Sequence, residues 1–493
     1  MESDELIFGG WVSTTRTVNR VRATVEFLII SLFDLCSLLA VFQLSVMLRI
    51  HILPHIYAGF PLKMQYRSFG HIWWIFLVWL FFFYYEGLYT KRFSYWDEIR
   101  ALCRVSFLST VGIFTILSFE KWSDEISRTL IILMGVLAIL FLPLIRLVLK
   151  KVLRRIGLLK RRVLILGAGE TGRRIQKALQ REPNYGYEVI GFVDDDDEKC
   201  GRWIEGVKVR KGVDEAAKYV KRCDIRDIFI AMPGAGKERL QWLINNLQHK
   251  VERILFVPDM FGIAVLGTGL RHFFREEVLA LEIENNLSNT FNIFIKRCFD
   301  IGVSILMLPF LFICMAVLAL LIRLDSRGPS IFSQERIGEK GKIFRCFKFR
   351  TMYVDAEERL TELFRQDPIV KTEWGERWKL KDDPRVTRIG KLLRSTSLDE
   401  LPQVLNVLKG EMSLVGPRPY LLRERREMGE NNHTILLTRP GITGLWQVSG
   451  RSNTGFNRRI ALDLWYVRNW NLWLDIVILF KTIRIILKRE GAY

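Results

Sequence analysis

The sequence predicts three successive parts: an α-helical membrane bundle of four spans, a cytoplasmic Rossmann-like α/β domain, and a mainly α monotopic domain with a re-entrant membrane helix. Three observations predict this architecture. Long apolar segments bordered by cations come first, a buried-strand pattern then runs into a glycine-rich turn, and a late apolar segment carries a proline near its middle. We place the boundaries at 1–150, 151–290 and 291–493, and a chain of 493 residues is long enough to give each part a core.

The first part holds four apolar segments long enough to cross a bilayer. They lie near 24–50, 71–90, 101–119 and 127–149. Lys and Arg crowd the N-terminal flank, the loop after the second segment and the stretch after the fourth, whereas the other two loops carry few cations. The positive-inside rule therefore predicts a multi-pass membrane protein with its N-terminus and everything after residue 150 in the cytoplasm.

The charge balance of the whole chain agrees with a membrane location. The net charge is +20 and hydrophobic residues make up 49% of the sequence, with the cations placed beside the apolar runs. This placement favours anionic lipid headgroups as partners, and we expect no nucleic-acid partner. The seven cysteines are scattered and form no CxxC pair, so neither a zinc site nor a disulfide framework is indicated.

The second part opens with the strand-like run 163–166, which leads directly into a glycine-rich turn. Gly167, Gly169 and Gly172 fit the GxGxxG spacing, and a second strand-like run ends at Asp194, where a dinucleotide fold would hold a ribose. The pattern predicts a Rossmann-type domain. A lone GxGxxG is weak evidence for a ligand, so we expect a structural or regulatory domain that has not retained NAD or another nucleotide.

The third part begins with an apolar segment from Cys298 to Ile322 that has cations on both sides. A full span is the default for this length, but it would place 323–493 outside the cell. Pro309 removes one backbone hydrogen bond and can kink a helix, which would let the segment enter and leave by the same face. We therefore predict a re-entrant helix-break-helix at about 296–323.

Beyond this helix, two adjacent carboxylates, Asp399 and Glu400, follow Arg394 and stand close to a proline. Further cations lie in two flanking stretches, Lys348-Phe349-Arg350 and Gly416-Pro417-Arg418-Pro419. In an extended segment Lys348 and Arg350 would point to the same side. Cations around a carboxylate pair suit phosphoryl chemistry, which needs a nucleophile or metal ligand and positive charge for the transferring group.

Each of these residues also has a structural alternative. Asp399 and Glu400 could simply begin a helix, where negative charge is favourable. Lys348 or Arg350 alone could be a surface cation, and the prolines beside Arg418 could only shape a turn.

On these motifs, residues 291–493 resemble the catalytic domain of the bacterial polyprenyl-phosphate hexose-1-phosphate transferases, the monotopic phosphoglycosyl transferases. The four spans and the Rossmann-like domain resemble the large members of the family, and the likeness is greatest to the undecaprenyl-phosphate galactose phosphotransferase branch. The resemblance implies transfer of a hexose-1-phosphate from a UDP-sugar to undecaprenyl phosphate, with release of UMP. This would be the first membrane step of O-antigen, capsule or exopolysaccharide synthesis, at the bacterial inner membrane.

The resemblance also implies roles for individual residues. Asp399 would form a covalent phospho-sugar intermediate, and Mg²⁺ would be bound by Asp399 and Glu400, with Glu400 tuning or assisting the attack. The remaining candidates hold phosphate or the carboxylates: Arg394, Lys348, Arg350 and Arg418 for phosphate contacts, and Gln403 for positioning the carboxylates.

Several alternatives stay open at this stage. The sugar is galactose by resemblance, with glucose as the runner-up, and the polymer is not named by any residue. A membrane-tethered NAD-dependent dehydratase or epimerase would use the Rossmann-like domain, but no tyrosine is followed by lysine four residues on, as the short-chain folds require. A scaffold of polysaccharide assembly would use the N-terminal parts. Inner-membrane lipids are expected partners, and a homodimer is compatible with the sequence.

Overall fold

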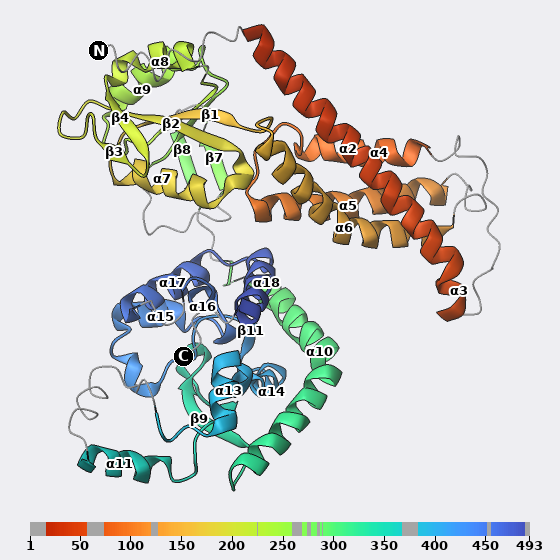
Figure 1. Cartoon of the computed structure of the whole chain (residues 1–493), viewed down its shortest axis with the longest axis vertical. Helices are drawn as coiled ribbons and strands as arrows, with labels where there is room; N and C mark the ends of the chain where they lie inside the picture. The colour runs from red at the N-terminus through yellow and green to blue at the C-terminus, as the bar shows by residue number, and fades with distance from the viewer. Residues whose placement is uncertain are drawn as a thin grey trace. The chain divides into compact units, whose positions relative to one another are not determined.

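The computed structural model describes ten stretches of the chain, drawn in colour in Figure 1: 16–56, 73–119, 127–223, 225–258, 269–273, 278–282, 286–287, 289–366, 383–450 and 455–488. The chain folds as two compact units, Met1–Asp259 and Met260–Tyr493. The first unit contains the helical bundle and the α/β sheet together, and the second contains the long apolar helix and the candidate site.

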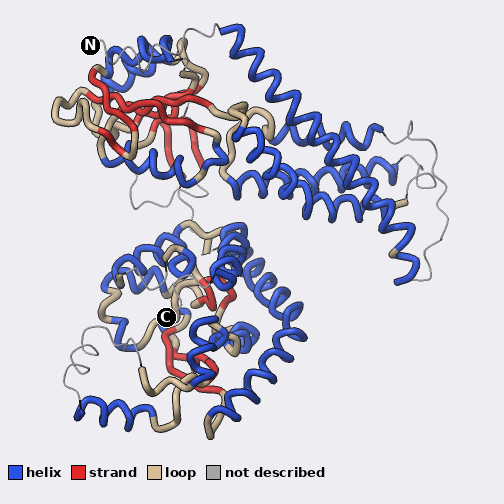
Figure 2. Tube along the Cα trace, viewed as in Figure 1, coloured by secondary structure: helices blue, strands red, loops and turns tan. Residues whose placement is uncertain are grey.

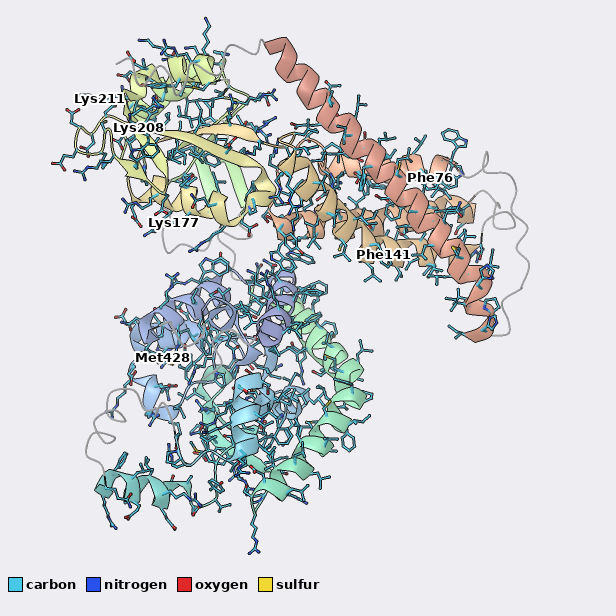
Figure 3. All side chains as sticks on the ribbon, viewed as in Figure 1. Phe76, Phe141, Lys177, Lys208, Lys211 and Met428 are labelled. Atoms are coloured by element: carbon cyan, nitrogen blue, oxygen red, sulfur yellow. The ribbon has the colours of Figure 1, made fainter. Side chains whose placement is uncertain are left out.

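Long helices build the first half of the first unit (Figure 1). They are α2 (Arg16–His51), α3 (Leu53–Ile56), α4 (Trp73–Glu86), α5 (Tyr95–Phe119) and α6 (Arg128–Arg155). Apolar side chains on their facing sides form one core that includes Leu38, Phe76, Trp79 and Phe83. Outward-facing positions are apolar too, and Figure 3 marks the half-exposed Phe141 on α6. Helices that are hydrophobic on all sides are typical of a membrane environment.

Three of the four predicted spans are long enough in the described residues to cross a bilayer, namely α2, α5 and α6. The exception is α4, which has 14 residues and so is about 21 Å long. That is shorter than the roughly 30 Å hydrocarbon core of a bilayer. Residues 71 and 72 of the predicted second span lie outside the described part of the chain.

Charged side chains are buried at the end of this bundle that meets the sheet. Arg146 on α6 pairs with Asp34 on α2 and with Glu98 on α5, both at 3.0 Å. Lys150 also reaches Glu98, at 2.6 Å. Asn184, which comes from the α/β domain, donates a hydrogen bond to the second oxygen of Glu98 at 2.7 Å. This network joins three helices of the bundle and attaches the α/β domain to them.

The α/β domain alternates strands and helices as the sequence predicts. Its elements are β1 (Arg161–Leu166), α7 (Glu170–Arg181), η3 (Pro183–Tyr185), β2 (Tyr187–Asp194), β3 (Trp203–Ile204), β4 (Val207–Lys211), η4 (Val213–Glu215), α8 (Ala216–Cys223), β5 (Asp227–Ile230), α9 (Lys237–Leu247) and β6 (Arg253–Phe256). The strand order is β3-β4-β2-β1-β5-β6, with parallel pairing throughout except at the β3 edge. Helices cover both faces of this sheet (Figure 2). The order reverses between β1 and β5, as in doubly wound folds.

The second unit is mainly helical, in agreement with the prediction. Its described elements before the motif region are β7 (Gly269–Phe273), β8 (Val278–Glu282), α10 (Thr290–Asp325), β9 (Ile331–Ile337), η5 (Glu339–Gly341), β10 (Ile343–Phe349), α11 (Ala356–Gln366) and α13 (Arg388–Thr396). The elements from the motif onward are η6 (Leu398–Glu400), α14 (Gln403–Lys409), β11 (Ser413–Val415), η7 (Leu422–Arg425), η8 (Gly429–Asn431), α15 (Asn432–Ile435), β12 (Gly441–Thr443), α16 (Leu445–Val448), α17 (Phe456–Arg468) and α18 (Leu472–Lys488).

Helix α10 differs from the predicted helix-break-helix. It is one continuous helix of 36 residues that passes through Pro309, and it curves along one side of its unit (Figure 1). The prediction of a break was wrong because proline removes a single backbone hydrogen bond. In apolar surroundings the remaining amides gain most by continuing the helix.

Both ends of α10 dock on the same unit, whereas its middle is exposed. Near the N-terminal end, Lys296 pairs with Asp475 at 2.6 Å and Asp300 accepts a hydrogen bond from Ser413 at 2.8 Å. At the C-terminal end, Asp325 accepts a hydrogen bond from the Ile389 amide at 3.1 Å. Only 6% of the most apolar 18-residue window is buried. The apolar middle of α10 is therefore a surface that protein does not cover within its own unit.

Candidate active site

The carboxylate pair stands on a tight turn between two helices. Thr387 caps the start of α13 by accepting a hydrogen bond from the Gly390 amide at 3.0 Å. The helix ends at Ser397, which has φ +57°, a left-handed conformation that is uncommon for a residue other than glycine. The single turn η6 follows and carries Asp399 and Glu400 before α14 begins. This reversal directs both carboxylates toward strand β10 instead of along the helix axis.

Lys348, the penultimate residue of β10, meets both carboxylates. Its Nζ lies 2.7 Å from Glu400 Oε1 and 4.0 Å from Asp399 Oδ2. The side chains of Asp399 and Glu400 are 17% and 30% exposed, so Asp399 is the more enclosed of the two. The structure therefore brings together three of the residues predicted from the sequence.

The surroundings shift the proton affinity of this group. Burial raises the pKa of Asp399 to about 6; Lys348 and Arg394 oppose the shift, and Glu400 adds to it. Burial disfavours the Lys348 ammonium, but the Glu400 and Asp399 carboxylates outweigh that effect and raise the pKa of Lys348. A shifted carboxyl beside a cation is typical of catalytic sites.

Arg394 approaches the same place from α13. Its Nε donates a hydrogen bond to Thr351 Oγ1 at 3.0 Å, and it is an electrostatic neighbour of Asp399. Thr351 follows the end of β10, so Arg394 links the strand that carries Lys348 to the turn that carries the carboxylates. Its guanidinium can therefore serve a phosphate that is held next to Asp399.

Arg418 lies on a separate turn, and Gly416 allows this turn to pack closely against the backbone at Arg439. A Cβ on Gly416 would lie 2.5 Å from the Arg439 carbonyl oxygen, so only glycine fits there. The Arg418 guanidinium packs over Trp446 at 5.5 Å from the ring centroid, and its Nη2 lies 3.8 Å from Glu424. Arg336, on β9, has both Arg418 and Glu400 as electrostatic neighbours.

The structure places Arg350 and Gln403 differently from Lys348. Arg350 donates hydrogen bonds to the Ser326 and Arg327 carbonyls, at 2.7 and 2.9 Å, which satisfies the end of α10. Its amide still donates to the Ser330 carbonyl at 2.9 Å, one pair beyond the end of β10, but its side chain bonds the chain at the end of α10 instead of the carboxylate turn. Gln403 is 1% exposed at the first position of α14, directly behind the carboxylate turn.

The pattern of motifs alone did not single out Arg336, Thr351 or Asp463. Asp463 is fully buried on α17 and accepts hydrogen bonds from the Arg418 amide and from Tyr420. Strand alternation was a sequence signal for Arg336, because it places the Arg336 side chain on the opposite face of β9 from the side chain of Glu335. No local pattern marks Asp463, whose partners lie more than forty residues away in the chain.

The chemistry of the carboxylate pair fits a magnesium ion. Mg²⁺ binds hard oxygen ligands and takes one or two carboxylates together with substrate phosphates, instead of a full cage of protein ligands. Within the described stretches, no group of three or more His, Cys, Asp or Glu side chains could hold a metal. The carboxylates of the adjacent residues Asp399 and Glu400 would supply this smaller set of protein ligands to a Mg²⁺ ion that also binds a diphosphate.

The glycine-rich turn of the α/β domain is also formed as the sequence predicts. Gly167 has φ +100°, and a Cβ on Gly172 would lie 2.2 Å from the Gly167 carbonyl oxygen. Gly169 is the N-cap of α7. Asp194, however, accepts hydrogen bonds from the Ala168 amide at 2.7 Å and from the Asp196 amide at 3.0 Å. The carboxylate that would hold a ribose is thus bonded to its own domain's backbone.

Comparisons with known proteins locate two regions. Residues 291–489 match the family model of the bacterial sugar transferases, and residues 84–258 match that of a CoA-binding domain. A UDP-galactose-lipid carrier transferase of Erwinia amylovora is 38% identical over 82% of this chain and 84% of its own length. An undecaprenyl-phosphate galactose phosphotransferase of Salmonella typhimurium is 37% identical over the same shares. A UDP-glucose:undecaprenyl-phosphate glucose-1-phosphate transferase of Klebsiella pneumoniae is 34% identical over 77% of this chain and 79% of its own length.

Proposed function

The chain belongs to the polyprenyl-phosphate sugar-1-phosphate transferases, and on that premise we propose that it transfers galactose-1-phosphate from UDP-galactose to undecaprenyl phosphate, releasing UMP. It is a phosphoglycosyl transferase of the membrane, and this transfer belongs to exopolysaccharide or O-antigen synthesis. The observation that carries the proposal is the Asp399–Glu400 pair, which meets Lys348 of β10 and stands on a turn that packs against the membrane helix α10.

Asp399 is the nucleophile of the proposed reaction. One of its carboxylate oxygens attacks the phosphorus that bears the sugar, the bond from that phosphorus to the bridging oxygen breaks, and UMP leaves with the electron pair. An acyl phosphate of Asp399 with the sugar-1-phosphate remains. An oxygen of undecaprenyl phosphate then attacks the same phosphorus, which releases the Asp399 carboxylate and forms the lipid-linked diphosphate sugar. Two displacements replace one direct reaction between two anions.

The neighbouring cations support this assignment. With a pKa of about 6, Asp399 is mostly ionised at neutral pH, as a nucleophile must be. Lys348 and Arg394 offset the negative charge that collects when a diphosphate approaches a carboxylate. Glu400, bonded to Lys348 at 2.7 Å, keeps that ammonium in place beside the reacting oxygen. Bound Mg²⁺, with Asp399 and Glu400 as its protein ligands, would supply further charge neutralisation for the phosphates.

The packing of the carboxylate turn near the end of α10 is evidence for a lipid substrate that reaches the site from the membrane. Ile322 of α10 forms a core with Phe349 and Leu393, and Leu398 and Leu401 pack against this core from either side of the carboxylates. The carboxylate turn therefore lies one side-chain layer from the end of α10. An acceptor whose tail stays in the bilayer can present its phosphate at that depth.

Both ends of α10 dock on one unit, and this favours a re-entrant course in which the helix enters and leaves the cytoplasmic side of the inner membrane. Single cysteines at Thr290 and Arg327, in a chain with its native cysteines replaced, test this topology. We expect a membrane-impermeant maleimide to label both from the cytoplasmic side only. Labelling of the two positions from opposite sides would show a full span instead.

The choice of galactose rests on the relatives. The two relatives named for galactose are 38% and 37% identical, and the one named for glucose is 34% identical. Glucose is therefore the alternative donor.

UMP release by the purified full chain, with undecaprenyl phosphate, Mg²⁺ and a panel of UDP-sugars, tests the proposal. We expect UMP with UDP-galactose in wild type and none above background in Asp399→Asn. Asp355→Asn is a matched control, because Asp355 is a half-exposed carboxylate on the same unit whose ion pair in the described residues is with Arg359, four residues on. Release with UDP-glucose alone would change the donor, and no release with any donor from folded protein would refute the activity.

A further inference from the structure

The turn that carries Arg418 is held at three consecutive residues. The Arg418 amide donates to Asp463 Oδ2 at 3.1 Å, the Pro419 carbonyl accepts from Arg336 Nη1 at 3.0 Å, and the Tyr420 hydroxyl donates to Asp463 Oδ2 at 2.7 Å. In addition, the Ile337 amide donates to the Tyr420 carbonyl at 2.9 Å. One buried anion and one largely buried cation thus hold this turn from two different elements, α17 and β9.

Such an arrangement needs a reason beyond stability. Asp463 is 0% exposed, and its Oδ1 has no hydrogen-bond partner among the residues that the structure describes. A buried carboxylate is unfavourable unless its contacts compensate for the loss of water, and an apolar side chain at such a position is often at least as stabilising. Burial raises the pKa of Asp463 to about 7, against the hydrogen bonds from Tyr420 and the Arg418 amide. The carboxylate is therefore best explained by what it positions.

What it positions is a cation whose side chain remains partly exposed. The Arg418 side chain leaves the fixed turn, packs over Trp446, and is 26% exposed. Arg459 packs over the same ring at 5.2 Å, so the indole supports two guanidinium groups. Arg418 Nη2 also lies 3.8 Å from Glu424, and a cation whose backbone is fixed and whose guanidinium is stacked is prepared to meet an anion with little reorganisation.

The location of the turn indicates which anion. Tyr420 belongs to a core formed with Met428, Ile435 and Ile460, whereas the carboxylate turn belongs to the core that packs on α10. Tyr420 thus packs in a core to which α10 contributes none of the described residues, although β11, just before this turn, meets α10 where Lys296 donates a hydrogen bond to the Val415 carbonyl at 3.0 Å. A soluble donor would bring its diphosphate to the Arg418 turn from the aqueous side, whereas the acceptor phosphate would come from the bilayer.

We propose that Asp463 and Arg336 are positioning residues that hold Arg418 against the diphosphate of the nucleotide-sugar donor. This inference rests on the proposed function. Neither residue touches the reacting atoms, and each acts through the Arg418 turn. Gln334, which accepts a hydrogen bond from Arg336 Nη2 at 2.7 Å, fixes the direction of the Arg336 side chain.

A double-mutant cycle tests the proposal with the full chain in detergent. The variants are Asp463→Asn, Arg418→Ala and the pair combined, and the readouts are UDP affinity by calorimetry and kcat/KM for UMP release. We expect Asp463→Asn to weaken UDP binding and to lower kcat/KM, mainly through KM, by about 10- to 100-fold, as removal of a supporting residue commonly does. In the Arg418→Ala background the same substitution should change neither quantity by more than about twofold.

Equal losses from Asp463→Asn in both backgrounds would overturn the proposal, because Asp463 would then act independently of Arg418. If Asp463→Asn does not fold, Tyr420→Phe and Arg336→Met replace it, since each removes one hydrogen bond that holds the Arg418 turn. We expect each of them to weaken UDP binding in the wild-type background and to have little effect in the Arg418→Ala background. UDP binding separates the two hypotheses. If Arg418→Ala masks the loss of UDP affinity but no UMP is released, the proposed transfer is refuted and the positioning role stands. If UMP is released but the losses from Asp463→Asn and Arg418→Ala add, the positioning role is refuted and the proposed transfer stands.

Discussion

Replacing Lys348 by methionine should move the pH dependence of the first displacement. Asp399 attacks only when it is ionised, so the rate falls as pH falls through its pKa of about 6. Lys348 Nζ lies 4.0 Å from Asp399 Oδ2 and favours the ionised form. Without that cation the pKa of Asp399 rises further, so the acid limb of the profile moves to higher pH and activity at neutral pH falls.

The size of this shift follows from the geometry. Two unit charges 4.0 Å apart interact by about 4 kcal/mol at an effective dielectric constant of about 20, and by about 1 kcal/mol in water. The Lys348 and Asp399 side chains are 29% and 17% exposed, so the interaction falls between these limits. At about 1.4 kcal/mol per pKa unit, the acid limb should move upward by about one to three pH units.

Single-turnover UMP release without undecaprenyl phosphate is the assay, with enzyme in excess over donor between pH 5 and 9. The donor's phosphates are diesters without a second ionisation, so the acid limb belongs to the enzyme. Lys348→Arg keeps the cation and should keep the limb near 6, and Lys391→Met removes an exposed lysine of α13 and should leave it unchanged. A limb that stays near 6 in Lys348→Met, with only the plateau lowered, would refute the reasoning and restrict Lys348 to phosphate contact.

Three further outcomes are expected. Asp399→Asn should lower UMP release by on the order of 10⁴-fold or more while the melting temperature stays within a few degrees; a tenfold effect would argue against a nucleophile. Arg350→Ala should destabilise the protein by roughly 1–3 kcal/mol in chemical denaturation, because the hydrogen bonds of Arg350 go to the end of α10. The KM for the donor should stay unchanged. A raised KM in a fully stable variant would instead support the phosphate contact predicted from the sequence. Glu98→Gln should destabilise by roughly 3–5 kcal/mol, since Arg146 and Lys150 lose a buried counter-charge, whereas Glu86→Gln, in an exposed pair, should change stability by about 1 kcal/mol or less.

Local patterns predicted the parts of this protein that depend on neighbours in the chain. The buried run 163–166 and the glycines after it predicted β1 and its turn, because only glycine accepts the φ of Gly167 and the close approach at Gly172. The motif around Asp399 predicted a site with cations, and the structure brings Lys348 and Arg394 to it from other elements.

Only the tertiary structure decided what depends on distant partners. Period-two alternation could not separate Lys348 from Arg350, because their partners come from other elements: Glu400 for Lys348, and the Ser326 and Arg327 carbonyls for Arg350. Proline at 309 suggested a break, yet α10 continues because an apolar environment penalises unpaired amides. The role of Asp463 could not be deduced from the sequence either. Its hydrogen-bond partners, the Arg418 amide and the Tyr420 hydroxyl, come close to it only when α17 packs in the folded unit. Sequence thus determined which chemical groups are available, and the fold determined which of them point at one another.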